Sequence, residues 1–253
     1  MPPLAMHTAI AKEIADAIRD SHLDDERGAL YLGSTAPDIR IITRWDRKLT
    51  HFFDLSNFEE QNGVRALFGK HPELAQPAKL QPQSISFVAG YLTHLVMDET
   101  WINQVYRPCF GEHSPMGGDI RASIMDRALQ YELDRARRED RPLIEHILNA
   151  IAKVDLGLDI GFLDEGTLSR WREVVLDVVN HPPDWERFRY VASRHLQQPI
   201  SDDEEAVAMV EFMRDLPSLV EETVRYLTPE RIDAFLEVSK KEGTGAVREY
   251  LCA

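Results

Sequence analysis

His94 and Asp98 are four residues apart, a spacing that places an imidazole and a carboxylate one turn apart on the same face of a helix. The same face carries aromatic and aliphatic residues, namely Phe87, Tyr91, Trp101 and Val105. The pair therefore faces a protein core, where a carboxylate is costly unless a positive charge compensates it. A metal ion would do so, with neutral imidazole and carboxylate as two of its ligands. A hydrogen bond between the two side chains in a metal-free core is the alternative.

Other histidines and aspartates in the first half of the chain are also of the types that bind metals. They are His7, Asp38, His51, His113, Asp119 and Asp126. Each one has an ordinary structural alternative, such as a packed core histidine, a helix cap or an internal salt bridge. Metal sites in helical bundles, however, are built from inward-facing ligands on separate helices. The joint pattern therefore predicts a metal site, whereas the scattered His146, His181 and His195 are interpreted as structural.

A basic patch lies between two of these candidates. It consists of Arg40, Arg44, Arg47 and Lys48, and it is the only dense cluster of positive charge in an acidic protein. A solvated loop is the ordinary interpretation of such a run. Guanidinium groups also match the geometry of phosphate, so the patch is a candidate for substrate binding.

The elements that must position these residues are predicted to be helices, because apolar residues recur at helical spacing and no convincing period-two strand occurs. We expect helices over residues 6–19, 84–106, 119–138, 142–154, 166–179, 185–195 and 201–226, a short one over 64–68, and another from 229 onward. Ser84 is the expected N-cap of the helix that carries His94. The predicted fold is an all-α, single-domain multi-helix bundle over 1–253. Its metal-binding half spans about 1–135 and its helical C-terminal half about 136–253.

Composition excludes several classes of protein. The 43 acidic and 29 basic residues give a net charge of −14, which argues against binding to polymeric nucleic acid and against stable association with anionic membranes. No signal peptide or transmembrane stretch is evident. Cys109 and Cys252 are the only cysteines, so a disulfide framework is not expected. These features predict a cytoplasmic protein, and they indicate no particular oligomeric state.

Four short motifs in the first half, taken in order, resemble the zinc-dependent phospholipase C and P1-type nuclease superfamily. The motifs are His7 on a helix, Gly33-Ser-Thr-Ala-Pro-Asp38, Thr50-His51-Phe52 and Gly90-Tyr-Leu-Thr-His94-Leu-Val-Met-Asp98. Members of this superfamily are all-helical phosphoesterases with a cluster of three zinc ions. The resemblance covers about residues 1–135.

Carried over to this sequence, the resemblance implies that Asp38, His51 and His94 bind one zinc ion. Asp98 would bridge that ion to a second, which His7 would also bind. The family's third zinc needs a histidine shortly after the bridging aspartate, and residues 101–104 contain none. His113, Asp119 and Asp126 are the candidate substitutes. We therefore expect one or two ions of Zn²⁺ or of another divalent transition metal, and not the full trio.

The resulting functional hypothesis is a metal-dependent hydrolase of a small anionic phosphoester or phosphodiester. Asp38 would orient or deprotonate the attacking water, as the resemblance suggests, and the basic patch would bind substrate phosphate. A metalloenzyme that acts on a different bond, for instance in a specialised biosynthetic pathway, is one alternative. A non-catalytic helical protein with a structural metal is another.

Overall fold

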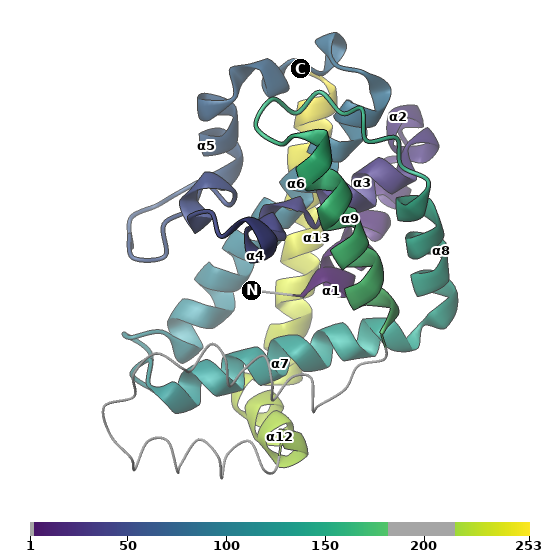
Figure 1. The fold of residues 1–253 in the computed structure, drawn as a ribbon. Coiled ribbons are helices and arrows are strands. Elements are labelled where there is room, and N and C mark those ends of the chain that lie inside the picture. The colour runs from purple at the N-terminus through teal and green to yellow at the C-terminus, as the bar shows by residue number, and fades with distance from the viewer. Residues whose placement is uncertain (1–2, 182–215) are drawn as a thin grey trace.

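The computed structural model describes residues 3–181 and 216–253, which form helices joined by loops, with no strand among them (Figure 1). The first part contains α1 (Leu4–Ile18), α2 (Ser21–Asp25), α3 (Arg27–Gly33), η1 (Ala36–Ile39), α4 (Arg40–Thr43), η2 (Arg47–Leu49), α5 (Gly63–Lys70), η3 (Pro72–Ala75) and η4 (Pro77–Lys79). The rest contains α6 (Pro82–Trp101), η5 (Ile102–Phe110), α7 (Ile120–Glu139), α8 (Arg141–Ala152), α9 (Glu165–Asn180), α12 (Leu216–Leu227) and α13 (Pro229–Leu251). The predicted all-α class is confirmed. The predicted helix over 185–195 and the start of the one over 201–226 lie outside the described residues.

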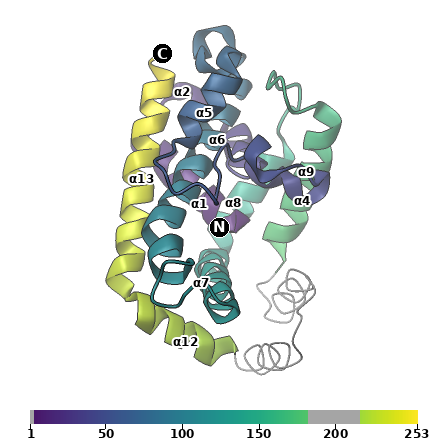
Figure 2. The ribbon, with the colours of Figure 1, turned by 90° about the vertical axis from the view of Figure 1, so that its left-hand side faces the viewer.

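Helix α6 runs through the middle of the bundle and is the element on which the others pack. Nearly every side chain from Ser84 to Trp101 is buried, so the helix has no solvent-facing stripe. The long α13 packs along it, and Figure 2 shows α13 extending along one whole side of the molecule. Helices α3 and α5 pack on other parts of its surface. Because a helix that is buried all round must satisfy its polar side chains internally, His94 and Asp98 require partners from these neighbours.

The ends of α6 differ from the prediction. Pro82 occupies the first turn and Gln81 is the N-cap, because the fixed φ of proline suits the start of a helix. Ser84 is therefore not the cap. Its hydroxyl oxygen instead accepts a hydrogen bond from the backbone N–H of Asp159, 2.9 Å away. At the other end the helix does not stop before Pro108 but continues as the π-helical η5, whose wider turns accommodate the proline.

Two glycines allow α3 and α6 to cross with their backbones in contact. A Cβ atom on Gly33 would lie 2.0 Å from the carbonyl oxygen of Phe87, and one on Gly90 would lie 2.0 Å from that of Leu30. Only glycine permits this approach. The crossing brings the segment that follows α3 directly over the face of α6 that carries His94.

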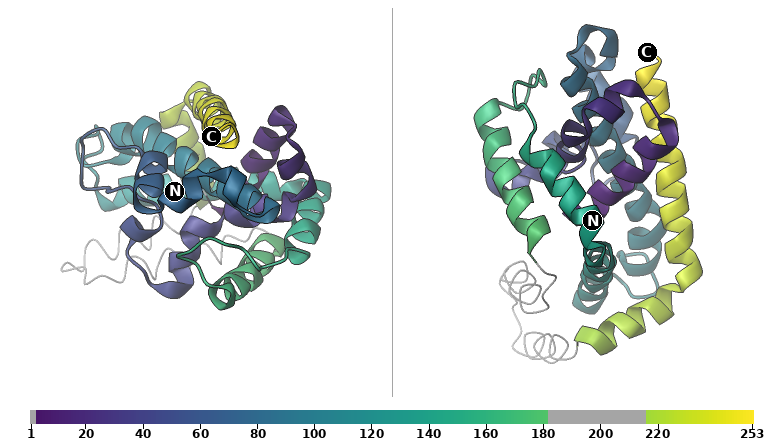
Figure 3. Two further views of the ribbon diagram at one scale, coloured as in Figure 1. Left: turned by 90° about the horizontal axis from the view of Figure 1, so that it is seen from above. Right: turned by 90° about the vertical axis from the view of Figure 1, so that its right-hand side faces the viewer.

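The remaining helices complete a core that includes residues from both halves of the chain. Helix α1 lies between α13 and the pair α8–α9, as the right-hand view of Figure 3 shows. Helix α7 packs against α1 and α12. Thus α1, which carries His7, packs against elements of both halves of the chain, with α8, α9 and α13 contributed by the C-terminal half. None of the helices in the described residues combines the length and the apolar character that crossing a bilayer requires.

We predict that Gly90→Ala destabilises the protein by about 1–3 kcal/mol or more, because a methyl group at the crossing overpacks two backbones. The expected result is a lower midpoint of denaturant unfolding. Gly245→Ala is the matched control, since no atom lies within 4 Å of a Cβ at that exposed position in α13. The control should be neutral or more stable, as alanine is the better helix former. Equal midpoints for the two variants would contradict the close crossing.

Candidate metal centre

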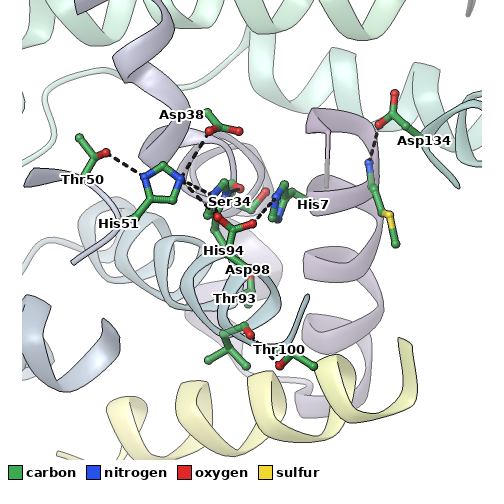
Figure 4. A network of polar contacts seen from close by, with 12 residues as sticks. His7, Ser34, Asp38, Thr50, His51, Thr93, His94, Asp98, Thr100 and Asp134 are labelled. Carbon is green, nitrogen blue, oxygen red and sulfur yellow. Dashed lines mark hydrogen bonds and ion pairs between the residues drawn. The ribbon is translucent and has the colours of Figure 1, made fainter. Parts of the chain in front are cut away.

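Helix α6 contributes His94 and Asp98 to a buried cluster of polar side chains (Figure 4). The Nδ1 of His94 lies 2.8 Å from the carbonyl oxygen of Ser34, in the segment that follows α3. A carbonyl can only accept, so Nδ1–H is the donor and the ring is held with Nε2 directed at the cluster. A second-shell hydrogen bond of this kind orients a metal-binding imidazole and sets its tautomer.

The turn after η2 contributes His51. Its Nδ1 lies 3.0 Å from the hydroxyl of Thr50, and the hydroxyl of Tyr91 on α6 donates to the carbonyl oxygen of Thr50. Phe52, the next residue, adopts a left-handed conformation with φ 53°. Such strain in a residue with a bulky side chain persists only where the surroundings impose it. Here it turns the chain so that the His51 imidazole enters the cluster.

Helix α1 contributes His7, which stacks on His94 with 3.8 Å between ring centroids. Its Nε2 lies 3.5 Å from Oδ1 of Asp98. Among the described residues, neither ring nitrogen of His7 has a hydrogen-bond partner, and neither does that carboxylate oxygen. Buried polar atoms without hydrogen-bond partners are rare and costly. These three atoms are therefore candidate metal ligands.

The spacing of the donor atoms also suits a cation. The Nε2 atoms of His51 and His94 are 3.4 Å apart, and Nε2 of His51 lies 3.5 Å from Oδ1 of Asp38. Two ligands at about 2.0–2.1 Å from one tetrahedral zinc ion would be about 3.3–3.4 Å apart. Two groups of three ligands occur in the described part of the chain, and they share one histidine: His7, His94 and Asp98, and Asp38, His51 and His94. The residues present therefore fit one or two metal ions.

The cluster is reached from solvent at Asp38. This carboxylate, on η1, keeps 13% of its side-chain exposure, whereas none of the four other residues exceeds 3%. Arg47, beside it, also keeps 13%. The two groups of three would each leave a coordination position without a protein ligand. That is the pattern of catalytic zinc sites, whereas structural sites are closed by four ligands.

The electrostatics prepare the histidines for metal binding. Burial lowers the pKa of His7, and it lowers the pKa of His51 to about 4, so both rings are neutral near pH 7. Burial also opposes the charge of His94, but the adjacent Asp98 carboxylate outweighs it and raises the pKa of this ring. A metal ion bound at this ring would compete with its protonation.

Both carboxylates of the cluster are ionised. Burial alone would raise their pKa values, but the neighbouring imidazoles outweigh it. His51 lowers the pKa of Asp38 to about 2, and His94 holds the pKa of Asp98 well below its ordinary value. The cluster therefore offers anionic oxygens together with the neutral nitrogens of His7 and His51, a donor set that suits zinc.

The four residues of the basic patch lie in different places. The Nη2 of Arg47 donates to Oδ2 of Asp98 at 3.0 Å, so this arginine enters the cluster. Arg40 is half-buried and lies close enough to Arg47 to lower its pKa, although burial is the larger cause. Arg44 is exposed, and Lys48 pairs with Asp54 at 2.7 Å. Only part of the patch therefore belongs to the centre.

The three candidate substitutes for the missing third site do not join the cluster. His113 lies in an exposed loop with its ring against Phe58. Asp119 is the N-cap of α7 and accepts from the N–H of Ala122. Neither of the two ligand groups in the described residues includes them or Asp126.

Asp126 is buried, but the carboxylate accepts hydrogen bonds from uncharged donors. Trp101 Nε1–H donates to it at 2.9 Å, and the amide of Gln130 donates at 2.7 Å. Each candidate thus has an explanation that needs no metal. Asp119 caps a helix, Asp126 accepts two hydrogen bonds, and His113 lies in an exposed loop.

Two residues that support the cluster were not predicted from the sequence, namely Ser34 and Asp134. Ser34 orients His94 through its backbone carbonyl, and because every residue has a backbone carbonyl, the sequence gives no sign of this role. Asp134 accepts a hydrogen bond from the backbone N–H of Met6, next to His7, and pairs with Arg138. In the sequence, the latter pair looks like an ordinary i,i+4 ion pair on a charged helix.

Comparison with known proteins identifies the first half of the chain. A family model described as zinc-dependent phospholipase C matches residues 6–133. The match includes all five clustered residues, and it confirms the resemblance derived from the four motifs. No curated protein and no solved structure matches the chain.

We predict that the metal-free protein loses stability between pH 7 and pH 5. A histidine whose folded pKa is depressed contributes stability above its unfolded pKa of about 6.5, and this contribution is lost as the pH falls toward the folded value. For His51, with a folded pKa of about 4, the loss by pH 5 is about 2 kcal/mol. His7 acts in the same direction and His94, with its raised pKa, in the opposite one.

The measurement is denaturant unfolding of chelator-treated protein at both pH values, beside His51→Gln. The variant should show a shallower decline, because the titrating group is gone. Parallel declines in the two proteins would contradict the buried, neutral state of His51.

Proposed function

The chain belongs to the zinc-dependent phospholipase C family, and we propose that it is a metal-dependent hydrolase that cleaves a small anionic phosphoester or phosphodiester. The observation that carries this proposal is the pair of ligand groups that share His94. Residues separated by more than ninety positions supply them, and the partnerless atoms of His7 and Asp98 lie at their centre. A hydrogen-bonded core has no need of such an arrangement.

Asp38, His51 and His94 would hold one ion, while His7 and Asp98 would hold a second, with Asp98 shared between the two. Bound divalent cations supply Lewis acidity toward a phosphoryl oxygen and lower the pKa of a bound water. The absence of a third ligand group from the described residues supports two ions as the upper number.

Asp38 is the proposed catalytic residue among the ligands. It is the more exposed of the two carboxylates of the cluster, and its depressed pKa keeps it ionised at neutral pH. An ionised carboxylate at the mouth can orient a water molecule and accept its proton. The second ion would have only His7 and Asp98 as protein ligands, and its remaining open positions support a catalytic centre over a closed structural site.

Arg47 and Arg40 are the proposed substrate-binding residues. Arg47 already donates to an anionic oxygen inside the cluster, so its guanidinium can reach a phosphoryl group bound there. Arg40 is half-buried and lies close enough to Arg47 to lower its pKa. These two cations give an anionic substrate a local attraction on a protein of net charge −14. Arg44 and Lys48 contribute at longer range.

We predict that metal content distinguishes two variants of the cluster. Asp98→Asn should reduce bound metal to near zero, because an amide cannot supply two anionic oxygens. His7→Ala should retain about one ion, since Asp38, His51 and His94 stay intact. Metal analysis of proteins purified without chelator, together with thermal melts in the presence and absence of Zn²⁺, measures both effects.

Hydrolysis of p-nitrophenyl phosphate and bis(p-nitrophenyl) phosphate by the same proteins tests the reaction. Wild-type activity that EDTA abolishes and Zn²⁺ restores is expected, with Asp38→Asn inactive. A wild-type protein that binds no metal, or equal metal content in all variants, would contradict the proposal.

We also predict that Arg47→Gln raises the KM for a phosphoester about tenfold or more, because a charge-assisted hydrogen bond to phosphate contributes about 1.5–3 kcal/mol. Arg44→Gln, which removes an exposed charge from the same patch, is the matched control and should change KM less than twofold. The metal content of Arg47→Gln must be measured as well, since this residue contacts Asp98. Equal KM values for the two variants would contradict a role of Arg47 in substrate binding and would support the interpretation of the patch as a solvated surface.

A further inference from the structure

The helix that carries His7 begins without a cap of its own. Pro3 occupies the N-cap position of α1 and offers no side-chain hydrogen bond. The first turn of a helix leaves backbone N–H groups unpaired, and here the residues from Leu4 to Ala11 are all buried, out of reach of water. The carbonyl oxygen of Pro3 accepts from the N–H groups of Met6 and His7 at 3.2 and 3.3 Å, but no side chain of the turn itself acts as a cap. A partner from elsewhere in the chain supplies a further acceptor.

Asp134, on α7, provides that partner. Its Oδ1 accepts from the backbone N–H of Met6 at 3.1 Å, across 128 positions of sequence. Figure 4 shows Asp134 and His7, both labelled, in the same view of the polar network. The side chain of Asp134 is 1% exposed, and its negative charge lies at the positive end of the α1 dipole. The carboxylate thus does for α1 what an N-cap side chain does for other helices.

Arg138 holds this carboxylate in place. Its Nε donates to Oδ2 of Asp134 at 2.6 Å, and its Nη1 donates to the carbonyl oxygen of Val178, at the end of α9, at 2.8 Å. The first turn of α1 is therefore fastened through two side chains to α7 and α9. Such buried ion pairs are expensive, and apolar residues of similar volume often replace them without loss of stability.

His7 depends on this turn for its position. Apart from the 3.5 Å contact of its Nε2 with Asp98, its ring has no hydrogen bond among the described residues, and stacking on His94 restrains only the ring plane. The place of Nε2 beside Asp98 therefore follows from where the first turn of α1 lies. His51 and His94, by contrast, each have a hydrogen bond at Nδ1.

We propose that Asp134 is a positioning residue for the second metal ion: its hydrogen bond to Met6 sets the position of His7 and so the affinity of the His7–Asp98 site. This inference rests on the proposed metal centre. Asp134 lies one position beyond the family match at 6–133 and would act through the backbone, without touching metal or substrate.

Two double variants isolate the hydrogen bond from the ion pair. Asp134→Leu with Arg138→Met replaces the pair by apolar side chains, so the fold is kept while the side-chain acceptor for Met6 is lost and only the carbonyl of Pro3 remains. Asp134→Asn with Arg138→Met is the matched control, because its amide oxygen still accepts from the N–H of Met6. Both lose the contacts of Arg138 equally. Zn²⁺ is titrated by calorimetry into each chelator-treated protein and into the wild type.

Loss of the acceptor should weaken binding of the second ion about tenfold or more, as outer-shell changes do, and leave the first ion unchanged. The asparagine variant should stay near the wild-type affinity. Two ions at wild-type affinity in the leucine variant, or an equal loss in both double variants, would overturn the positioning role alone. A wild type that binds fewer than two ions would overturn the two-metal centre and this inference with it.

Discussion

A carboxylate buried at the centre of a helical bundle is the constraint on which the rest of this structure depends. Asp98 is 3% exposed and ionised, and its environment within about 3.5 Å consists of three imidazoles and one guanidinium. A charge in such a place must be compensated, because desolvation costs far more than a single neutral hydrogen bond returns. The helices are arranged so that several donors from distant segments converge on this one side chain.

The side chains of the cluster converge because contacts to the backbone fix the segments that carry them. The glycines of α3 and α6 allow a crossing close enough for the carbonyl of Ser34 to orient His94. The hydroxyl of Tyr91 fixes the turn that presents His51, and the carboxylate of Asp134 fixes the start of α1. Each device belongs to a different pair of elements. The centre is thus a property of the whole bundle, and elements of the C-terminal half support it although its candidate ligands all lie in the first half.

The same arrangement would allow an acidic protein to bind the anionic substrate that we propose. A net charge of −14 repels anions at long range, but positively charged arginine side chains lie at the candidate metal centre. Arg47 enters the cluster and Arg40 stands beside it, whereas Lys48 is neutralised by Asp54. Local charge at short range outweighs a diffuse field that salt screens.

The sequence by itself determined the fold class, the family and the identity of the five clustered residues, because helical periodicity and short motifs are local properties. It misjudged the start of α6 at Ser84 and its end at Pro108, where a proline cap and π-helical turns prevailed. It also left Asp126 as a candidate ligand, which the indole of Trp101 satisfies instead. Only the tertiary structure decided that Asp119 and Asp126 stay outside the cluster, which arginine enters it, and that Asp134 reaches α1. Those outcomes depend on contacts across as many as 128 positions of chain, which local pattern does not encode.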